Sequence, residues 1–218
     1  MPTWILDNLV IVGGLRSSRV SDIEAVSLDE DITNCDPTDL PYKLGYQASV
    51  YTPVLNGFLV CGSEYENGTS KCIIQSKRND SNQFPALSSV KIGLSLTSIS
   101  NKIYAIGGLP VHEINWESSE YNIMEDNIME TINFNTDRQW KKEEMPFSVF
   151  DHCSVGLGND IIVTGGWGKN WIVSKLVLKL TWNKIVWVSN FISSARIYQM
   201  PNIMVAQLGG INMRSNCR

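Results

Sequence analysis

Residue types that could perform acid–base, nucleophilic or metal chemistry are scarce in this sequence. The 218 residues include only two histidines, His112 and His152. There is no glycine-rich phosphate loop, Cys-x-x-Cys pair, His-Glu-x-x-His motif or serine nucleophile elbow. The acidic residues show no spacing typical of a catalytic pair. We therefore predict a protein that is not an enzyme and has no metal site and no cofactor.

The five cysteines could form disulfides. Cys61 and Cys72 flank an eleven-residue step that is typical of a hairpin, so a cross-strand disulfide between them is sterically feasible. Asn67 and Asn79 each begin a sequence that fits the N-glycosylation pattern. Together these features favour an extracellular protein. The alternative is that the cysteines are buried free thiols and that both glycosylation patterns occur by chance.

A third group of residues is typical of surfaces that bind another protein. The segment 109–127 contains His112, Trp116 and Tyr121 together with several acidic residues. Trp and Tyr are enriched in the energetic centres of protein interfaces. We expect a protein partner to contact these three side chains and four others elsewhere in the chain, namely Trp167, Trp171, Arg16 and Arg19. The alternative is a solvated acidic insertion whose Trp folds back on its own sheet.

The charge and hydrophobicity of the sequence argue against nucleic acids and membranes as the main partner. The formal net charge is −4 and the isoelectric point is near 5.2, whereas nucleic acids and anionic membranes demand a basic face. No apolar run approaches the roughly 18 residues needed to span a bilayer. With 43% hydrophobic and 18% charged residues, the chain can bury a core. We expect a globular protein that binds neither nucleic acid nor a membrane interior.

A sequence repeat indicates the secondary-structure elements that must position these residues. A diglycine, or Cys-Gly in one copy, follows a short apolar run rich in β-branched residues five times. The second glycines stand at positions 14, 62, 108, 166 and 210, which gives steps of 48, 46, 58 and 44 residues. Self-similarity at such a period indicates a repeat architecture. The long step of 58 residues is explained by the segment 109–127.

Each repeat fits four short strands. In the best-preserved unit, the sequence predicts strands over 150–155, 161–164, 171–178 and 185–188, with turns at 158–160 and 181–184. No stretch shows a sustained helical period with caps. Glycines that end the second strand allow close backbone approach and a positive φ.

At this point the chain resembles the kelch-repeat family. In one unit, Trp140 is followed by Met145-Pro146, His152 and Gly165-Gly166, in the order of the family pattern. A second copy has Trp187, Ala195-Arg196 and Gly209-Gly210 but lacks the His, and two weaker copies precede these. The resemblance implies a kelch-type β-propeller of four-stranded antiparallel blades. It also implies a structural, core hydrogen-bonding role for His152.

The number of repeats is lower than the six or seven blades usual in kelch propellers. We expect one all-β domain over 1–218 with about four to five blades, in units near 1–42, 43–88, 89–146, 147–190 and 191–218. Both chain ends fall within a repeat, which predicts a partial or truncated member of the family.

Meander topology places the connections of each blade on two faces. The loops that follow the diglycine strands, expected at 15–21, 63–70, 109–127 and 167–170, share one face, and short turns occupy the other. Long loops on a rigid scaffold are where binding usually occurs. The resemblance therefore implies a non-catalytic protein-binding module. Two alternatives are a secreted or cell-surface module that binds glycan or protein, and an enzyme of the mutarotase or oxidase type that some kelch propellers resemble.

Overall fold

A computed structural model gives the fold of the chain. It describes residues 2–5, 8–15, 19–27, 33–34, 45–55, 57–64, 69–76, 81–110, 127–168, 174, 176–182 and 187–194, with side chains mainly within 47–75, 83–110 and 127–181. These residues form β-strands and a single short 3-10 turn, η1 (Pro53–Leu55). Within the described ranges, no helix has the length and hydrophobicity needed to cross a bilayer.

Four antiparallel sheets of four strands make up most of the molecule. The first contains β1 (Pro2–Ile5), β2 (Asn8–Leu15), β3 (Arg19–Ser27) and β4 (Thr33–Asn34). The second contains β5 (Gly45–Thr52), β6 (Gly57–Glu64), β7 (Thr69–Ser76) and β8 (Ser81–Phe84). The third contains β10 (Ser95–Ile99), β11 (Lys102–Ile106), β13 (Ile128–Asn133) and β14 (Lys141–Glu144). The fourth contains β15 (Cys153–Leu157), β16 (Asp160–Thr164), β17 (Leu176–Trp182) and β18 (Trp187–Ser194).

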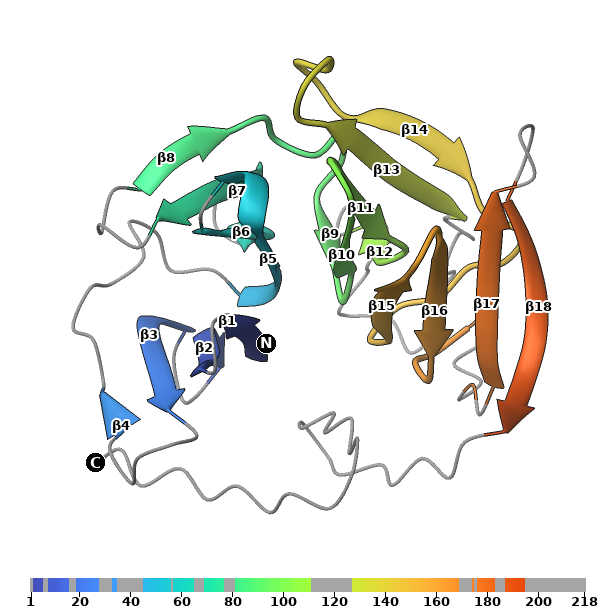
Figure 1. The fold of residues 1–218 in the computed structure, drawn as a ribbon, viewed down its shortest axis with the longest axis horizontal. Coiled ribbons are helices and arrows are strands. Elements are labelled where there is room, and N and C mark those ends of the chain that lie inside the picture. The colour runs from blue at the N-terminus through green and yellow to red at the C-terminus, as the bar shows by residue number, and fades with distance from the viewer. Residues whose placement is uncertain are drawn as a thin grey trace, which may run out of the picture.

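The sheets follow one another around a common centre, with β1, β5, β10 and β15 innermost and β4, β8, β14 and β18 at the periphery (Figure 1). The inner strands of neighbouring sheets contact one another, β5 with β10 and β10 with β15. This is the arrangement of blades in a propeller. The prediction of an all-β fold built from four-stranded antiparallel blades is confirmed. A small extra sheet pairs β9 (Lys91–Ile92) with β12 (Leu109–Pro110).

Apolar packing between sheets forms the core. One cluster joins the second and third sheets and includes Ala48, Leu59, Cys61, Leu96 and Ile103. Another joins the third and fourth sheets and includes Ile99, Ile106, Met129, Ile161 and Leu180. Each fully buried Leu or Ile contributes about 1.5–3 kcal/mol relative to an exposed one. The apolar contacts between blades therefore contribute to the stability of this fold.

The disulfide predicted between Cys61 and Cys72 is present. The two residues are directly opposed in the β6–β7 ladder, with their Cα atoms 4.1 Å apart, and both are buried in the cluster between the second and third sheets. The remaining described cysteine, Cys153, lies in β15 and is not part of a disulfide.

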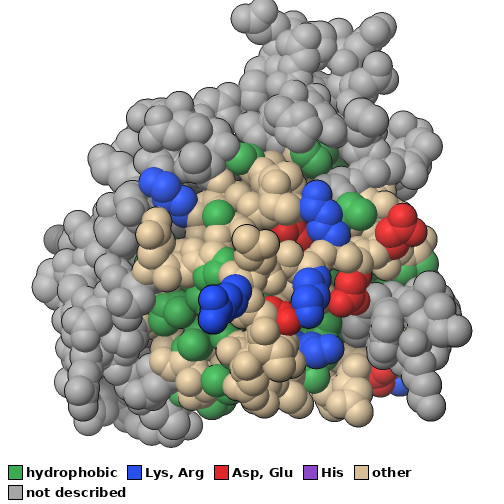
Figure 2. All heavy atoms as spheres, turned by 90° about the horizontal axis from the view of Figure 1, so that it is seen from above, with side chains coloured by type: hydrophobic (Ala, Val, Ile, Leu, Met, Phe, Trp, Pro, Cys, Tyr) green, Lys and Arg blue, Asp and Glu red, His purple; other side chains and the backbone are tan. Residues whose placement is uncertain are grey.

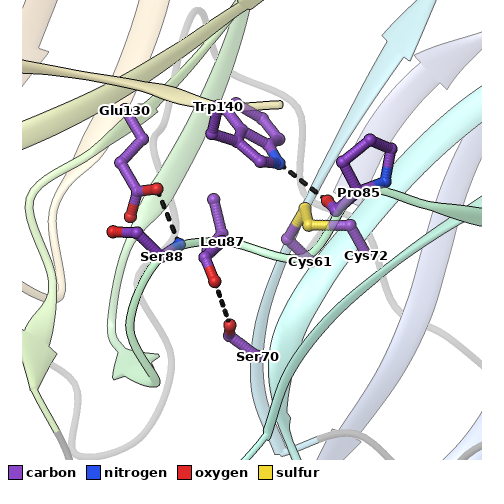
Figure 3. Close-up of a disulfide and its surroundings, with 8 residues drawn as sticks. All are labelled: Cys61, Ser70, Cys72, Pro85, Leu87, Ser88, Glu130 and Trp140. Atoms are coloured by element: carbon purple, nitrogen blue, oxygen red, sulfur yellow. Dashed lines mark hydrogen bonds between the residues drawn. A yellow bond between two sulfur atoms is a disulfide. The ribbon is translucent and has the colours of Figure 1, made fainter. Parts of the chain in front are cut away.

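The linker from the second to the third sheet passes beside this disulfide (Figure 3). Trp140 donates its Nε1–H to the Pro85 carbonyl over 2.7 Å, and Ser70 donates its hydroxyl to the Leu87 carbonyl, also over 2.7 Å. Trp140 belongs to the third blade and Ser70 to the second. The linker is therefore tied to both blades that it joins.

Three strand predictions for the fourth blade were wrong at their boundaries. The fourth strand covers Trp187–Ser194 rather than 185–188. The first strand begins at Cys153 rather than at residue 150, because Asp151 has a φ of 51°, which an extended strand does not accommodate. The third strand covers Leu176–Trp182 rather than 171–178, and the turn predicted at 181–184 starts too early. Buried Leu180 keeps this part of the strand in the core, and Trp182 still pairs with Trp187.

Candidate functional site

The diglycines mark one side of the third and fourth blades. After Gly107-Gly108 the chain enters β12, and after Gly165-Gly166 it reaches Trp167. Trp167 and Phe150 exchange two backbone hydrogen bonds, of 2.8 and 3.0 Å. This bridge lies at the same place in the fourth blade as the β9–β12 pair in the third. In both blades, the residues that follow the second strand and its diglycine pair through their backbones with the residues that precede the first strand.

An apolar cluster joins the two ladders. Ile92, Leu109 and Phe150 are buried together, and the half-buried Trp167 packs against them. The predicted site residue Trp167 therefore has a defined structural role, because its backbone forms the ladder of the fourth blade and its side chain packs against the cluster that joins the two ladders.

Lys91 holds both ends of the segment 111–126. Its backbone pairs with Pro110, the last described residue before that segment. Its Nζ donates to the carbonyl of Ile128, at the start of β13, over 3.1 Å. Asn127 and Met145 add a backbone bond of 2.7 Å and a side-chain bond of 3.2 Å at the same end. The segment with the predicted partner-binding aromatics therefore leaves and re-enters the blade at fixed points.

The charge of Lys91 is buried and faces Glu130. Their side chains are 3% and 1% exposed, and Nζ lies 4.0 Å from Glu130 Oε1. Glu130 Oε2 accepts the backbone N–H of Ser88 at 2.8 Å, while Oε1 has no hydrogen bond within the described part of the chain. A buried charge is tolerated when it is paired and hydrogen-bonded. Sequence reasoning did not identify this pair, because the two residues lie on different strands and no local motif joins them.

A second polar group lies between the inner strands of the third and fourth blades. His152 Nε2 is 2.7 Å from Ser95 Oγ, which is 2.7 Å from Ser154 Oγ, and Ser154 also bonds to Thr97. His152 is fully buried, and its Nδ1 has no hydrogen-bond partner among the described residues. We assign the proton to Nε2, since a buried N–H without an acceptor costs more than an unpaired lone pair.

Serine beside histidine is the pairing used in nucleophilic catalysis, but this pair is closed to substrate. Ser95 is 3% exposed and His152 is 0% exposed. Burial lowers the pKa of His152 from its ordinary value of 6.5 to about 3, so the imidazole is neutral near pH 7. The group acts as a hydrogen-bonded link between blades, which agrees with the structural role that the sequence resemblance implied for His152.

Most of the predicted partner-binding residues lie outside the described residues. These are His112, Trp116, Tyr121, Trp171 and Arg16, and the glycosylation candidates Asn67 and Asn79 also fall there. Arg19 begins β3, where its backbone pairs with Leu15, and its side chain is not described. Of the predicted set, Trp167 is the residue whose packing is described.

Two of the four long loops predicted on this face are shorter than expected. Strand β2 extends to Leu15, which pairs with Arg19, so the first loop is not 15–21. Strands β6 and β7 extend until Glu64 pairs with Thr69, so the second is not 63–70. In the second hairpin the ladder continues through the polar pairs Ser63–Ser70 and Glu64–Thr69, since backbone pairing does not require apolar side chains. The segment 111–126 therefore remains the longest connection on the predicted face.

Charges on the outside of the molecule are mixed. In the view of Figure 2, Lys or Arg side chains alternate with Asp or Glu. On the third blade, Lys141 pairs with Asp137 at 2.6 Å, and Lys142 is followed by two glutamates. Among the described residues, no three His, Cys, Asp or Glu side chains are grouped so as to hold a metal ion.

Comparison with known proteins supports the fold. No protein-family model matches the chain, and no curated protein matches it in sequence. Among solved structures, YjhT, a kelch-repeat β-propeller protein, matches with a TM-score of 0.69 at 13% sequence identity. The match covers 89% of this chain and 65% of YjhT, so the chain spans somewhat less than two thirds of that protein. The chain has the kelch-type propeller fold.

Proposed function

We propose that this propeller is a non-catalytic protein-binding module whose partner docks on the side of the blades where the diglycine strands end. The observation that carries the proposal is the anchoring of the segment 111–126. Lys91 and Asn127 fix its two ends on the third blade. A recognition loop benefits from rigid attachment, because less conformational freedom is lost when a partner binds.

The residues proposed to contact the partner are those predicted from the sequence. Trp116, Tyr121 and His112 belong to the anchored segment, and Trp167 lies next to its base through the cluster with Leu109. Trp171, Arg16 and Arg19 complete the proposed set. A mixed aromatic and charged surface of this kind suits a folded protein partner better than a polyanion, given the net charge of −4.

Replacing Trp116 with Ala is expected to abolish partner capture while the propeller stays folded. A buried interfacial Trp typically contributes 2 kcal/mol or more, so affinity for the isolated partner should fall by about 30-fold or more. The measurement is affinity capture from the native source followed by titration of the captured partner. Lys102→Ala is the control, because Lys102 is exposed on the opposite, short-turn side of the same blade. Equal capture by the wild type and Trp116→Ala would contradict the proposal.

A second candidate function is supported by the disulfide. A buried Cys61–Cys72 bridge suits a secreted or cell-surface module, because structural disulfides persist in oxidising compartments. In that setting the same face would bind a glycan or an extracellular protein.

Alkylation of the native protein without reductant tests this second candidate. We expect Cys61 and Cys72 to remain unmodified while Cys153 reacts after unfolding, and mass spectrometry should find glycan at Asn67 or Asn79. The double variant Cys61→Ala/Cys72→Ala is the matched control for the assignment of the bridge. Alkylated Cys61 and Cys72 together with bare asparagines would exclude the secreted module.

A further inference from the structure

Asp151 lies at the entrance to β15, the innermost strand of the fourth blade (Figure 1). Its backbone N–H donates to the carbonyl of Gly93 over 2.7 Å. Gly93 directly follows β9, and β9 pairs with β12 at the point where the chain enters the segment 111–126. Asp151 therefore lies between the third and fourth blades, on the side where the diglycine strands end and beside the base of that segment.

The backbone of Asp151 is left-handed, with a φ of 51°. Gly93 stands 58 residues earlier, which is the spacing of the diglycines of the two blades, and has a φ of 66°. Glycine adopts this conformation without strain, whereas Asp tolerates it mainly when its side chain hydrogen-bonds to nearby backbone. The backbone thus requires a left-handed residue at this position but does not require a carboxylate.

The carboxylate of Asp151 lies against Gly93. A Cβ added to Gly93 would be 2.4 Å from Oδ1 of Asp151, so the glycine leaves the room that the carboxylate occupies. In the part of the chain that the structure describes, this carboxylate makes no hydrogen bond and no ion pair. Burial raises the pKa of Asp151, because nothing offsets the hydration that its charge has lost. The side chain is nevertheless only half-buried, so a ligand can reach it.

A half-buried carboxylate without a counter-charge is suited to a cation. The ammonium of Lys91 is engaged elsewhere, because it donates to the Ile128 carbonyl and faces Glu130. A divalent metal ion would have too few ligands, since the described residues group no three His, Cys, Asp or Glu side chains. A guanidinium or an ammonium group needs no further acidic ligand, and it forms strong charge-assisted hydrogen bonds with one carboxylate.

We propose that Asp151 binds a basic side chain, Lys or Arg, of the protein partner. The inference rests on the proposed function, because it assigns a chemistry to the partner that docks on this side of the blades. Trp167 adjoins the site, since its backbone exchanges two hydrogen bonds with Phe150, the residue before Asp151. Trp and Arg are the residue types most enriched where interfaces gain their energy. Asp151 therefore extends the proposed partner surface from the segment 111–126 towards the centre of the propeller.

Asp151→Asn is the matched variant, because Asn keeps the size of the side chain and tolerates a φ of 51° while it removes the charge. Asp160→Asn is the control, since it changes the net charge equally but lies at the short-turn end of the blade and is paired with Lys179 at 2.7 Å. In thermal unfolding near pH 7, Asp151→Asn should be at least as stable as the wild type, because an unpaired, half-buried charge is unfavourable. A lower melting temperature would show that the carboxylate supports the fold, and would overturn the proposal.

Random peptides displayed on phage and selected on the immobilised, full-length chain test the ligand. Peptides selected on the wild type should share one position occupied by Lys or Arg, and they should also bind Asp160→Asn. A synthetic copy of a selected peptide should bind Asp151→Asn about tenfold or more weakly than the wild type, because a charge-assisted pair is lost. Replacing its basic residue with norleucine should weaken binding to the wild type similarly, with little further effect on Asp151→Asn.

Equal affinity of the selected peptides for the wild type and Asp151→Asn would overturn the proposal, as would the absence of a shared basic position or of any selected peptide. Trp116→Ala separates this failure from a failure of the proposed function. Peptides that need Trp116 but not Asp151 would leave the proposed function in place and remove the inference. Peptides that need Asp151 but not Trp116 would support the site for a basic side chain and count against the segment 111–126 as a contact.

Discussion

Replacing Gly107 with Ala is expected to destabilise the propeller by about 3 kcal/mol or more. Gly107 has a φ of 58°, where a residue with a Cβ is strained by roughly 1–2 kcal/mol. A Cβ there would also lie 2.1 Å from the carbonyl oxygen of Val149. That oxygen accepts the backbone N–H of Gly108 at 2.9 Å, a bond between the end of β11 and the segment that enters the fourth blade. The substitution must therefore displace or break this link between blades, at a further cost of about 1 kcal/mol or more.

Gly158→Ala separates the two contributions. Gly158 has a similar φ of 62°, but a Cβ added there meets nothing within 4 Å. Both substitutions reduce the conformational entropy of the unfolded chain to a similar extent, so this effect cancels in the comparison. Urea unfolding followed by Trp fluorescence should show Gly158→Ala destabilised by about 1 kcal/mol through its positive φ alone, and Gly107→Ala destabilised by about 3 kcal/mol, a difference of about 2 kcal/mol. For a chain of this size, that difference corresponds to roughly 4–8 °C in melting temperature. Equal effects would show that the contact with Val149 does not matter.

The place of the diglycines at the ends of strands was predictable, because it depends on the conformation of the glycines themselves and not on distant contacts. A glycine at the end of a β-branched run carries its own conformational signature, and β11 and β16 end at the residue before their diglycines. The Cys61–Cys72 bridge was predictable for a similar reason, since a hairpin brings residues of adjacent strands together. What the repeat could not give was the length of each hairpin. β2 continues past its glycines to Leu15. β6 continues past Gly62 to Glu64, because polar residues pair through their backbones as well as apolar ones do.

Contacts between separate sheets were not predictable from one sequence. Ser95 and His152 are 57 residues apart, and Lys91 and Glu130 lie on different strands. These pairs form only when two sheets pack, and no local sequence motif predicts them. The burial of Glu130 is an example, because a glutamate within Ile128–Asn133 has the appearance of a surface residue in sequence but is 1% exposed. The candidate site was likewise predictable only in part. The blades that carry it follow from the repeat, whereas the contacts of Lys91 that fix the segment 111–126 depend on packing.

Lowering the pH is expected to weaken the fold through His152. Its pKa is about 3 in the folded protein and 6.5 ordinarily, so the unfolded chain binds a proton that the folded chain does not. The ionisation of His152 therefore leaves the free energy of unfolding unchanged above about pH 6.5 and lowers it progressively as the pH falls from 6.5 towards 3. One proton changes the free energy of unfolding by about 1.4 kcal/mol per pH unit, so the loss reaches about 3 kcal/mol near pH 4.

The matched variant for this effect is His152→Leu. Leu94 stands at the equivalent position of the third blade and is 1% exposed, so a leucine side chain suits this environment. Ser95 keeps its bond to Ser154 when the imidazole is removed. The variant should thus stay folded at pH 7, and its free energy of unfolding should fall less steeply between pH 6.5 and 4 than that of the wild type.

The difference between the two proteins isolates the imidazole, because every carboxyl group is common to both. Asp151, next to His152, has its pKa raised by burial, so the folded state takes up its proton first and gains stability as the pH falls through that pKa. This contribution has the opposite sign to that of His152 and is shared by wild type and variant. His112→Gln controls for the other histidine and should retain the wild-type slope. Urea titrations at half-unit intervals of pH measure all three proteins. Parallel curves for wild type and His152→Leu would show that His152 is protonated without cost, and that the link between the third and fourth blades does not depend on a neutral ring.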